Sequence, residues 1–248
     1  MKNLGKVVAS IEARMTSTRL PGKVLLPVLG KPILFYLVER LKSVRKIDEI
    51  VLATTINPQD DSLEAFAIEN NIKCFRGSED DVLQRVIGAV DSVNGTTIIE
   101  ITGDCPIVDV ELVSQVISLY EHNDVKYASN AHIRSYPDGM DVQVFALDTL
   151  IKSSTMTTNS LHREHVSLHI RENSCLFPHA NLIAPPKLNY PNLGLTLDEP
   201  DDYKLLKTLI ERLYPLNPLF GCMEVLDLLA ENPELLKLNN LVERKRNT

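Results

Sequence analysis

The sequence predicts an α/β fold in which helices cover both faces of a mostly parallel sheet. Short apolar runs typical of buried strands alternate with longer segments whose apolar residues recur at helical spacing. Strands separated by helices of this length are typical of βαβ units, which build parallel sheets. The chain has 248 residues, 44% of them hydrophobic and 24% charged, so it is long enough to bury one large core. No repeat or low-complexity linker divides it, and we expect a single domain over residues 1–248.

The first half of the chain alternates regularly between strands and helices. Strands are expected at residues 7–11, 50–54, 72–75 and 97–102, where apolar residues run together. Helices are expected at residues 31–46, 60–70, 80–91 and 109–120. Pro32 suits the first turn of the first helix, and Asp60 and Asp109 can cap the second and the fourth.

The second half is less regular. Strands are expected at residues 124–129 and 139–146, which flank a Tyr-Pro-Asp-Gly turn, and at residues 193–197. Helical segments are expected at residues 147–154, 160–171, 200–213 and 222–237, with a loop rich in proline and asparagine at 178–192. We therefore expect residues 125–192 to form an insertion or lid in the single domain, and residues 214–248 to form a helical C-terminal tail.

Composition excludes several classes of protein. The net charge is −7, and no basic tract offers the broad positive surface of a general nucleic-acid binder. No apolar run reaches the length of a membrane span, and the N-terminus lacks the core of a signal peptide. The four cysteines lack the spacing of a zinc ribbon or a disulfide framework. We therefore expect a cytoplasmic protein with neither a nucleic-acid nor a membrane partner.

A loop with three cations follows the first strand. Residues 13–23 carry Arg14, Arg19 and Lys23 among small and hydroxyl side chains, and Pro21-Gly22 opens the turn so that Lys23 can point back. Such a loop at a strand end can hold a highly charged anion, for example a nucleoside triphosphate. The alternative is a solvated basic surface loop. We favour the anion site because this local positive charge lies in an acidic chain.

Two aspartates are expected to lie beside this loop. Asp104 follows the fourth strand and Asp198 follows the strand expected at 193–197. Ligands of open α/β sheets lie at the carboxyl ends of the strands, where both aspartates are expected. Mg²⁺ takes one or two carboxylates together with phosphate oxygens and water, so this pair suits a magnesium nucleotide. The alternative for each is a helix cap, above all for Asp198, which precedes Pro200.

Ordered motifs along nearly the whole chain resemble the CMP-sugar synthetase superfamily. They are ARMTSTRLPGK (13–23), FRGSEDDVLQR (75–85), ITGDCP (101–106), YPDGMDV (136–142), HREHV (162–166) and LTLDEPDD (195–202). The motifs resemble those of the acylneuraminate and 3-deoxy-manno-octulosonate cytidylyltransferases, and they most resemble those of the spore-coat-polysaccharide branch. The resemblance implies a Rossmann-like fold of the nucleotide-diphospho-sugar transferase type. It also implies transfer of CMP from CTP to a sugar, with release of pyrophosphate, a Mg²⁺ cofactor, a role in surface polysaccharide synthesis and, as in many relatives, a homodimer.

The resemblance assigns roles to individual residues. It implies that Arg14, Lys23, Asp104 and Asp198 are catalytic, and that the last two hold the metal. The nucleotide-binding residues that it implies are Ala13, Arg14, Ser17, Arg19, Lys23, Arg76, Asp81, Arg85, Thr102 and Asp104. Three positions depart from the family pattern. Thr16 stands where glycine is frequent, Cys105 replaces the residue that often follows the metal aspartate, and Gln143 stands where an acid is common.

Residues 130–170 are expected to form the acceptor pocket, because this segment is dense in side chains that recognise hydroxyl and carboxylate groups. The expected acceptor-binding residues are Tyr136, Asp138, Asp141, Gln143, Arg163 and Glu164. Arg163 would pair bidentately with the carboxylate of an acidic 2-keto sugar such as a nonulosonate or octulosonate. The alternative is that Arg163 and Glu164 lie on a solvated helix face or form an ion pair in a dimer. A zinc site at His162, His165 and His169 is disfavoured, because no HExxH pattern accompanies them.

Two other functions remain open at this point. One is a nucleotidyltransferase that uses UTP, dTTP or GTP on a sugar 1-phosphate, although its usual loop begins with a glycine cluster that this chain lacks. The other is a nucleotide-binding homologue without catalysis, which the presence of Lys23, Asp104 and Asp198 disfavours. The expected partners are CTP and a sugar acceptor whose identity the sequence does not give.

Overall fold

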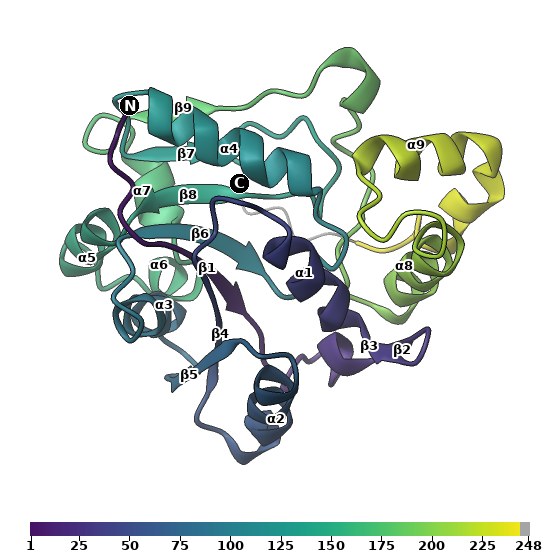
Figure 1. Ribbon diagram of the computed structural model, residues 1–248, viewed down its shortest axis with the longest axis horizontal. Coiled ribbons are helices and arrows are strands. Elements are labelled where there is room, and N and C mark those ends of the chain that lie inside the picture. Colours follow the sequence, from purple (N-terminus) through teal and green to yellow (C-terminus); the bar gives the residue numbers. More distant parts are fainter. Residues whose placement is uncertain (244–248) are drawn as a thin grey trace.

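The computed structural model describes residues 1–243, and one seven-stranded sheet runs through its centre in the order β5-β4-β1-β6-β8-β7-β9 (Figure 1). The strands are β1 Val7–Glu12, β4 Glu49–Thr55, β5 Lys73–Gly77, β6 Thr97–Thr102, β7 Tyr127–Ser129, β8 Gln143–Ala146 and β9 His179–Asn181. β8 pairs antiparallel with both of its neighbours, and the other pairings are parallel. The mostly parallel α/β sheet is thus confirmed. A short hairpin of β2 (Pro27–Val28) and β3 (Lys31–Pro32) lies outside it.

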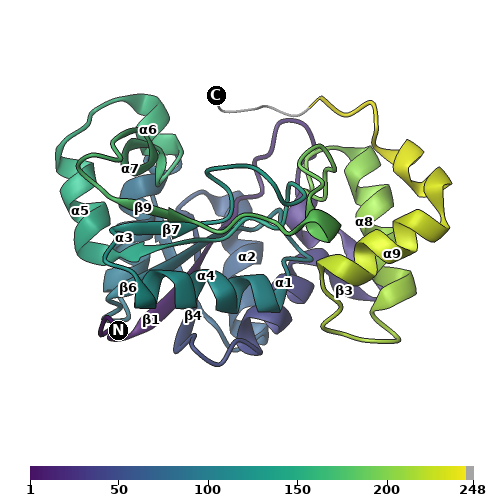
Figure 2. The same ribbon diagram turned by 90° about the horizontal axis from the view of Figure 1, so that it is seen from above.

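Helices cover both faces of the sheet (Figure 2). They are α1 Ile33–Lys42, α2 Asp61–Glu69, α3 Val82–Asp91, α4 Val110–His122, α5 Leu147–Thr155, α6 Ser160–Glu164, α7 Leu168–Glu172, α8 Pro200–Leu213 and α9 Cys222–Glu231. Four 3₁₀ segments complete the set: η1 Lys23–Leu25, η2 Pro58–Asp60, η3 Pro186–Leu188 and η4 Pro233–Leu238. α1 and α4 lie on one face of the sheet and α5, α6 and α7 on the other, while α8 and α9 pack together at one end. None of the helices within residues 1–243 combines the length and the apolar character needed to cross a membrane.

The two faces of the sheet differ in polarity. On β1, Val7, Ala9 and Ile11 pack into the core shared with α1 and α4, whereas Val8 packs with α3. The next residues on the α3 side are polar, Ser10 and Glu12. The same change occurs across the sheet, because the register aligns a row of polar residues: Ser10, Glu100, Gln143, Ser129 and Asn181. The α3 face is therefore polar towards the carboxyl ends of β1 and β6.

Residues 193–197 do not form the strand that the sequence predicts. A single bridge joins Gly194 to Asp138, and the backbone of this segment otherwise bonds to loops. The Leu195 N–H donates to the Asp138 carbonyl oxygen at 2.6 Å, and the Leu197 N–H to that of Asp104 at 2.8 Å. Two different loops thus take the hydrogen bonds that a neighbouring strand would have supplied.

Other boundaries also differ from the prediction. The first helix begins at Ile33, because residues 31–32 pair in the β2–β3 hairpin. The helix expected at 160–171 breaks at His165, where ψ is 85°, and the following Val166 is buried in the core. The strand expected at 139–146 begins only at Gln143, because Gly139 has a φ of 104° and turns the chain. In the expected C-terminal tail, α9 ends at Glu231 before η4, and residues 244–248 lie outside the described part.

Candidate functional site

Backbone hydrogen bonds close the cationic loop at residues 13–23. The Met15 N–H donates to Asp60 Oδ1 at 2.7 Å, and the Gly22 N–H donates to the Met15 carbonyl oxygen at 3.0 Å. Gly22 has a φ of 69°, a left-handed conformation that favours glycine. Asp60 was expected to cap α2, but its buried carboxylate makes no cap bond and instead accepts from Thr54, Thr55 and this loop. Asp60 thus fixes the loop from which the cations project.

Lys23 lies between the two candidate metal-binding aspartates. Its Nζ donates to Asp104 Oδ2 at 2.8 Å and to Asp198 Oδ1 at 3.1 Å. The side chain is 13% exposed, so the ion pairs lie in a partly desolvated environment. The structure thus brings Lys23 together with Asp104, 81 residues later in the sequence, and with Asp198, 175 residues later.

The two loop arginines are also paired with acids. Arg19 Nη2 lies 2.9 Å from Asp198 Oδ1, and its Nη1 lies 3.6 Å from Glu199 Oε1. Arg14 Nη1 lies 3.1 Å from Glu79 Oε1, which also accepts from the Thr16 hydroxyl at 2.6 Å. A glycine at position 16 could not make that bond. The loop is therefore a set of cations held by carboxylates, which disfavours the solvated basic loop.

Neither Asp104 nor Asp198 serves as a helix cap. The α4 cap is Asp109, whose Oδ1 accepts from the backbone at Glu111 and Leu112. α8 is capped by Glu199 together with Asp202. The Asp198 carboxylate is therefore directed at the loop cations, although its N–H donates to Asp202 Oδ2 at 3.1 Å.

The charges in this cluster stabilise one another. Burial lowers the pKa of Lys23, but the charges of Asp104 and Asp198 and their hydrogen bonds outweigh it, so the pKa is raised. Burial likewise raises the pKa of Asp104, and the charge of Lys23 with hydrogen bonds from Lys23 and Thr102 reverses this, so the pKa is lowered. The Thr102 hydroxyl donates to Asp104 Oδ1 at 2.6 Å. Asp104 therefore stays ionised and available to a cation.

The other residues assigned to the nucleotide lie around the ends of β4, β5 and α3. Arg76 donates to the carbonyl oxygens of Thr55 and Asn57 and pairs with Asp61 and Glu64. Arg85 is 3% exposed and donates to the Ser78 carbonyl oxygen. Both arginines thus brace the loops at this edge. Ala13 is buried, and Ser17 Oγ accepts from the Leu20 N–H at 3.4 Å.

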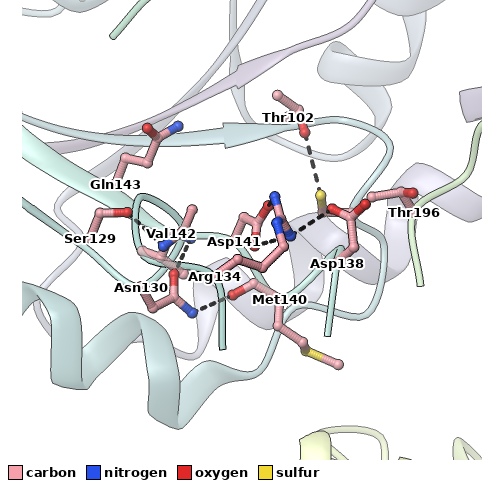
Figure 3. Close-up of polar contacts among 12 residues, drawn as sticks. Thr102, Ser129, Asn130, Arg134, Asp138, Met140, Asp141, Val142, Gln143 and Thr196 are labelled. Carbon is pink, nitrogen blue, oxygen red and sulfur yellow. Dashed lines mark hydrogen bonds and ion pairs between the residues drawn. The ribbon is translucent and has the colours of Figure 1, made fainter. Parts of the chain in front are cut away.

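Arg134 pairs with two of the residues that were expected to bind the acceptor (Figure 3). Its Nη1 lies 3.0 Å from Asp138 Oδ1, and its Nη2 lies 3.1 Å from Asp141 Oδ2. Burial raises the pKa of Asp141 to about 6, although the Arg134 charge opposes the rise. The bridge from Asp138 to Gly194 connects this loop to the segment that carries Asp198. The acceptor loop and Asp198 are therefore held in one arrangement.

The remaining acceptor-side predictions are distributed differently. Tyr136 is 2% exposed and packs in the apolar core between α1, α8 and α9. Gln143 Oε1 accepts from the Tyr127 hydroxyl at 2.5 Å and from the Ser167 hydroxyl at 2.6 Å. Arg163 Nη2 lies 3.0 Å from Asp81 Oδ2, which joins α6 to the start of α3, while Glu164 is exposed. The structure thus does not bring Tyr136, Arg163 and Glu164 together with Asp138 and Asp141.

Two acids lie on the α3 face of the sheet: Glu100 is buried, whereas Glu12, at the end of β1, is half-buried. Burial, and next the charge of Glu100, raises the pKa of Glu12 well above its ordinary value. Burial raises the pKa of Glu100 to about 7, against the charge of Arg171 and hydrogen bonds from Ser167 and Gln143. One oxygen of each carboxylate is buried without a hydrogen-bond partner. The protonated forms suit this environment better than the charged forms.

Sequence reasoning did not find Glu79, Arg134, Glu12 or Glu100. Glu79 and Arg134 stand in polar stretches of the sequence where any charged residue could be solvated. Only the tertiary contacts show which oppositely charged side chain each one pairs with. Glu12 and Glu100 could have been found, because each interrupts an otherwise apolar strand, VVASIE and TIIEIT. An acid within a buried strand is a signal for a functional or paired group.

The three histidines of the second half do not gather around one metal position. His162 lies in α6, where Nδ1 contacts the Thr157 hydroxyl and Nε2 contacts Glu172, whereas His169 lies in α7 and contacts Ser153. His165 ends α6, so it does not share a helix face with His169. Within residues 1–243, no group of three or more histidine, cysteine, aspartate and glutamate side chains is arranged to hold a metal ion.

Comparisons of this chain with known proteins match it to one group of proteins over most of its length. Residues 8–211 match the family model of cytidylyltransferases. The spore coat polysaccharide biosynthesis protein SpsF of Bacillus subtilis is 34% identical over 93% of this chain and 97% of its own length. A cytidylyltransferase structure from Leptospira borgpetersenii has a TM-score of 0.88 and 31% identity, and the match covers 98% of this chain and 99% of that one. The 8-amino-3,8-dideoxy-manno-octulosonate cytidylyltransferase of Shewanella frigidimarina is 31% identical over 48% of this chain and 49% of its own.

Proposed function

This chain belongs to the cytidylyltransferase family, and on that premise we propose that it transfers CMP from CTP to a sugar to form a CMP-sugar. The observation that carries the proposal is the convergence of Lys23, Asp104 and Asp198 at the carboxyl edge of the sheet, with Arg14 and Arg19 in the same loop. Such a cluster of cations beside two carboxylates suits a triphosphate and a divalent cation. We place the reaction in the cytoplasm.

The proposed reaction needs charge neutralisation and alignment more than covalent help from the protein. The acceptor hydroxyl oxygen attacks the α-phosphorus of CTP, the bond from this phosphorus to the oxygen bridging the β-phosphorus breaks, and pyrophosphate leaves. The hydroxyl proton passes to solvent. Lys23, Arg14 and Arg19 would stabilise the charge that gathers on the leaving pyrophosphate. Ala13, Ser17, Arg76, Asp81, Arg85 and Thr102 would line or brace the nucleotide site.

Mg²⁺ is the cofactor that we propose, and the residues present fit it. One nitrogen, Lys23 Nζ, contacts oxygens of both Asp104 and Asp198, so a single small cation can also reach both. Two carboxylates leave ligand positions that CTP oxygens and water can fill, which is the usual arrangement for this ion. When bound, Mg²⁺ would polarise the α-phosphate.

The acceptor that we propose is an acidic 2-keto sugar used in surface polysaccharide synthesis. The names of the SpsF protein and of the octulosonate cytidylyltransferase support this class. Asp138, Asp141 and Arg134 would recognise its hydroxyl groups from the loop beside Asp198, and Gln143, at the start of β8, remains a proposed further contact. Arg163 remains proposed for its carboxylate, although it must first leave Asp81, and Glu164 remains proposed for its hydroxyl groups.

A substrate panel tests the function. Pyrophosphate release is measured with CTP, UTP, GTP and dTTP against acidic and neutral sugars and their 1-phosphates. The proposal expects release with CTP and an acidic 2-keto sugar. Turnover with another nucleotide and a sugar 1-phosphate, or no turnover with any pair, would overturn it. Light scattering on the same preparation tests the expected homodimer.

Two variants test the proposed metal ligands. Asp104→Asn and Asp198→Asn should each lower turnover by orders of magnitude while the melting temperature changes little, since neither side chain contributes to the apolar core. Asp201→Asn is the matched control, because Asp201 is exposed and pairs only with Lys204 among the ion pairs of this region. Normal magnesium-dependent turnover in either test variant would refute the assignment.

A further inference from the structure

The two candidate metal ligands are held together by cations of the protein itself. Lys23 Nζ contacts Asp104 Oδ2 and Asp198 Oδ1, and Arg19 Nη2 contacts that same Asp198 oxygen. Two negative charges from distant parts of the chain are thus balanced by two positive charges from one loop. Without these contacts, the carboxylates would repel each other across a partly desolvated space.

The Lys23 ammonium and a divalent cation compete for the same oxygens. An ammonium donates to carboxylates at about 2.8–3.1 Å, whereas Mg²⁺ needs oxygens at about 2.0–2.1 Å with near-octahedral directions. A cation bridging the same two oxygens would place its two charges beside the ammonium, and this repulsion is large where water is partly excluded. Lys23 must therefore leave the carboxylates before a metal can bridge them.

The loop permits this movement without a change in its backbone. Lys23 begins η1, and the Lys23 N–H donates to the Leu20 carbonyl oxygen at 3.2 Å, so its backbone is fixed. The four-carbon side chain can turn about this fixed point from the carboxylates to another anion. A triphosphate held by Arg14 and Arg19 in the same loop would supply that anion.

We propose that Lys23 is a positioning residue whose ammonium group serves as an internal cation and holds Asp104 and Asp198 together. A divalent metal then binds to these aspartates only together with a nucleoside triphosphate. This inference rests on the proposed function, because it assumes that a triphosphate enters this loop. The outer phosphates draw the ammonium away and the metal takes its place, so that each carboxylate keeps a cation beside it. Metal and triphosphate then raise each other's affinity by the same factor.

Binding of Mn²⁺ to the full chain, followed by electron paramagnetic resonance, tests the proposal without turnover. Wild-type protein should bind Mn²⁺ weakly alone, and at least tenfold more tightly with CTP. CMP is the matched nucleotide control, because it lacks the outer phosphates and should leave the Mn²⁺ affinity within a few-fold of the free protein. Equal enhancement by CMP and CTP, or tight Mn²⁺ binding without nucleotide, would overturn the inference.

Substitution of Lys23 supplies the second arm. Lys23→Met removes the ammonium and retains the length of the side chain, so the variant should bind Mn²⁺ alone at least tenfold more tightly than wild type. Lys23→Arg retains a cation and should stay close to wild type. Lys46→Met is the control, because Lys46 pairs with Glu121 in α4 and not with either aspartate. No gain in Lys23→Met overturns the proposal, and Lys23→Gln, which also lacks the ammonium, takes its place if Lys23→Met does not fold.

The outcomes separate this inference from the proposed function. An enzyme that releases pyrophosphate from CTP but binds Mn²⁺ tightly without nucleotide keeps the function and loses the role of Lys23. A chain in which Lys23→Met gains Mn²⁺ affinity, but which transfers CMP to no sugar, keeps the role of Lys23 and loses the proposed reaction.

Discussion

Glu100 predicts how the stability of the fold depends on pH. Its carboxyl group is 5% exposed, and its pKa rises from 4.5 to about 7 in the folded protein. Between these two values the folded state binds the proton more tightly than the unfolded state, so stability falls as the pH rises through this window. At 1.36 kcal/mol for each pH unit between the two pKa values, the loss reaches about 3 kcal/mol by pH 8. The loss is absent below pH 4.5.

The variant Glu100→Gln removes this ionisation and keeps the shape of the side chain. Its free energy of unfolding should lie within about 1 kcal/mol of wild type at pH 4.5 and exceed it by up to about 3 kcal/mol at pH 8. Urea denaturation at a series of pH values measures the difference. The charge of Glu100 also raises the pKa of Glu12, so its removal lessens the cost of ionising Glu12 and adds to the gain of the variant at high pH. Glu69→Gln, on the exposed face of α2, is the control and should give no such trend. A difference between Glu100→Gln and wild type that does not change with pH would refute the reasoning.

Three further variants test the supports of the site. Asp60→Asn should cost about 2 kcal/mol in urea denaturation, because a buried acceptor of several hydrogen bonds loses its charge and part of its capacity; an unchanged midpoint would contradict this. Gly139→Ala should lower both melting temperature and turnover, since φ is 104° and the new Cβ would lie 2.5 Å from the Leu195 carbonyl oxygen; wild-type values of both would show that the loop adapts. A double-mutant cycle of Arg163→Ala with Asp81→Ala should give a coupling of about 0.5–1 kcal/mol, as expected for a partly exposed pair. Zero coupling would show that Arg163 is free for a substrate.

Local patterns were sufficient for much of the fold. The periods of apolar residues located the strands and helices of the first half of the chain within a few residues. They could do so because each helix buries one face and each central strand buries both. The placement of β8, antiparallel between β6 and β7, is set by contacts between distant segments. The extended run Leu193–Leu197 has the composition of a strand, yet its backbone bonds to the Asp104 and Asp138 loops. Composition cannot distinguish these two uses of an extended segment.

Part of the candidate site was also predictable from the order of strands and helices. Asp104 and Lys23 follow strands whose carboxyl ends meet at one edge, so their proximity follows from topology. Asp198 lies at the same edge for a different reason, because its segment is held there by contacts with loops and does not belong to a strand of the sheet. The partners of Arg14, Arg134 and Arg163 could not be predicted, since choosing among many acids needs the tertiary structure.

The bridge between the acceptor loop and the Asp198 segment limits how this enzyme family can be re-engineered. The Asp138 N–H donates to the Leu193 carbonyl oxygen at 2.9 Å, and Asp138 accepts from Leu195 in return. A chimera that imports residues 134–142 alone from a relative would set a foreign backbone against Leu195 and displace the aspartate three residues later. If residues 134–142 recognise the sugar as proposed, sugar preference and catalytic competence would then change together, and screens would discard useful pockets as inactive. A transplant should therefore exchange residues 134–142 and 193–198 as one cassette.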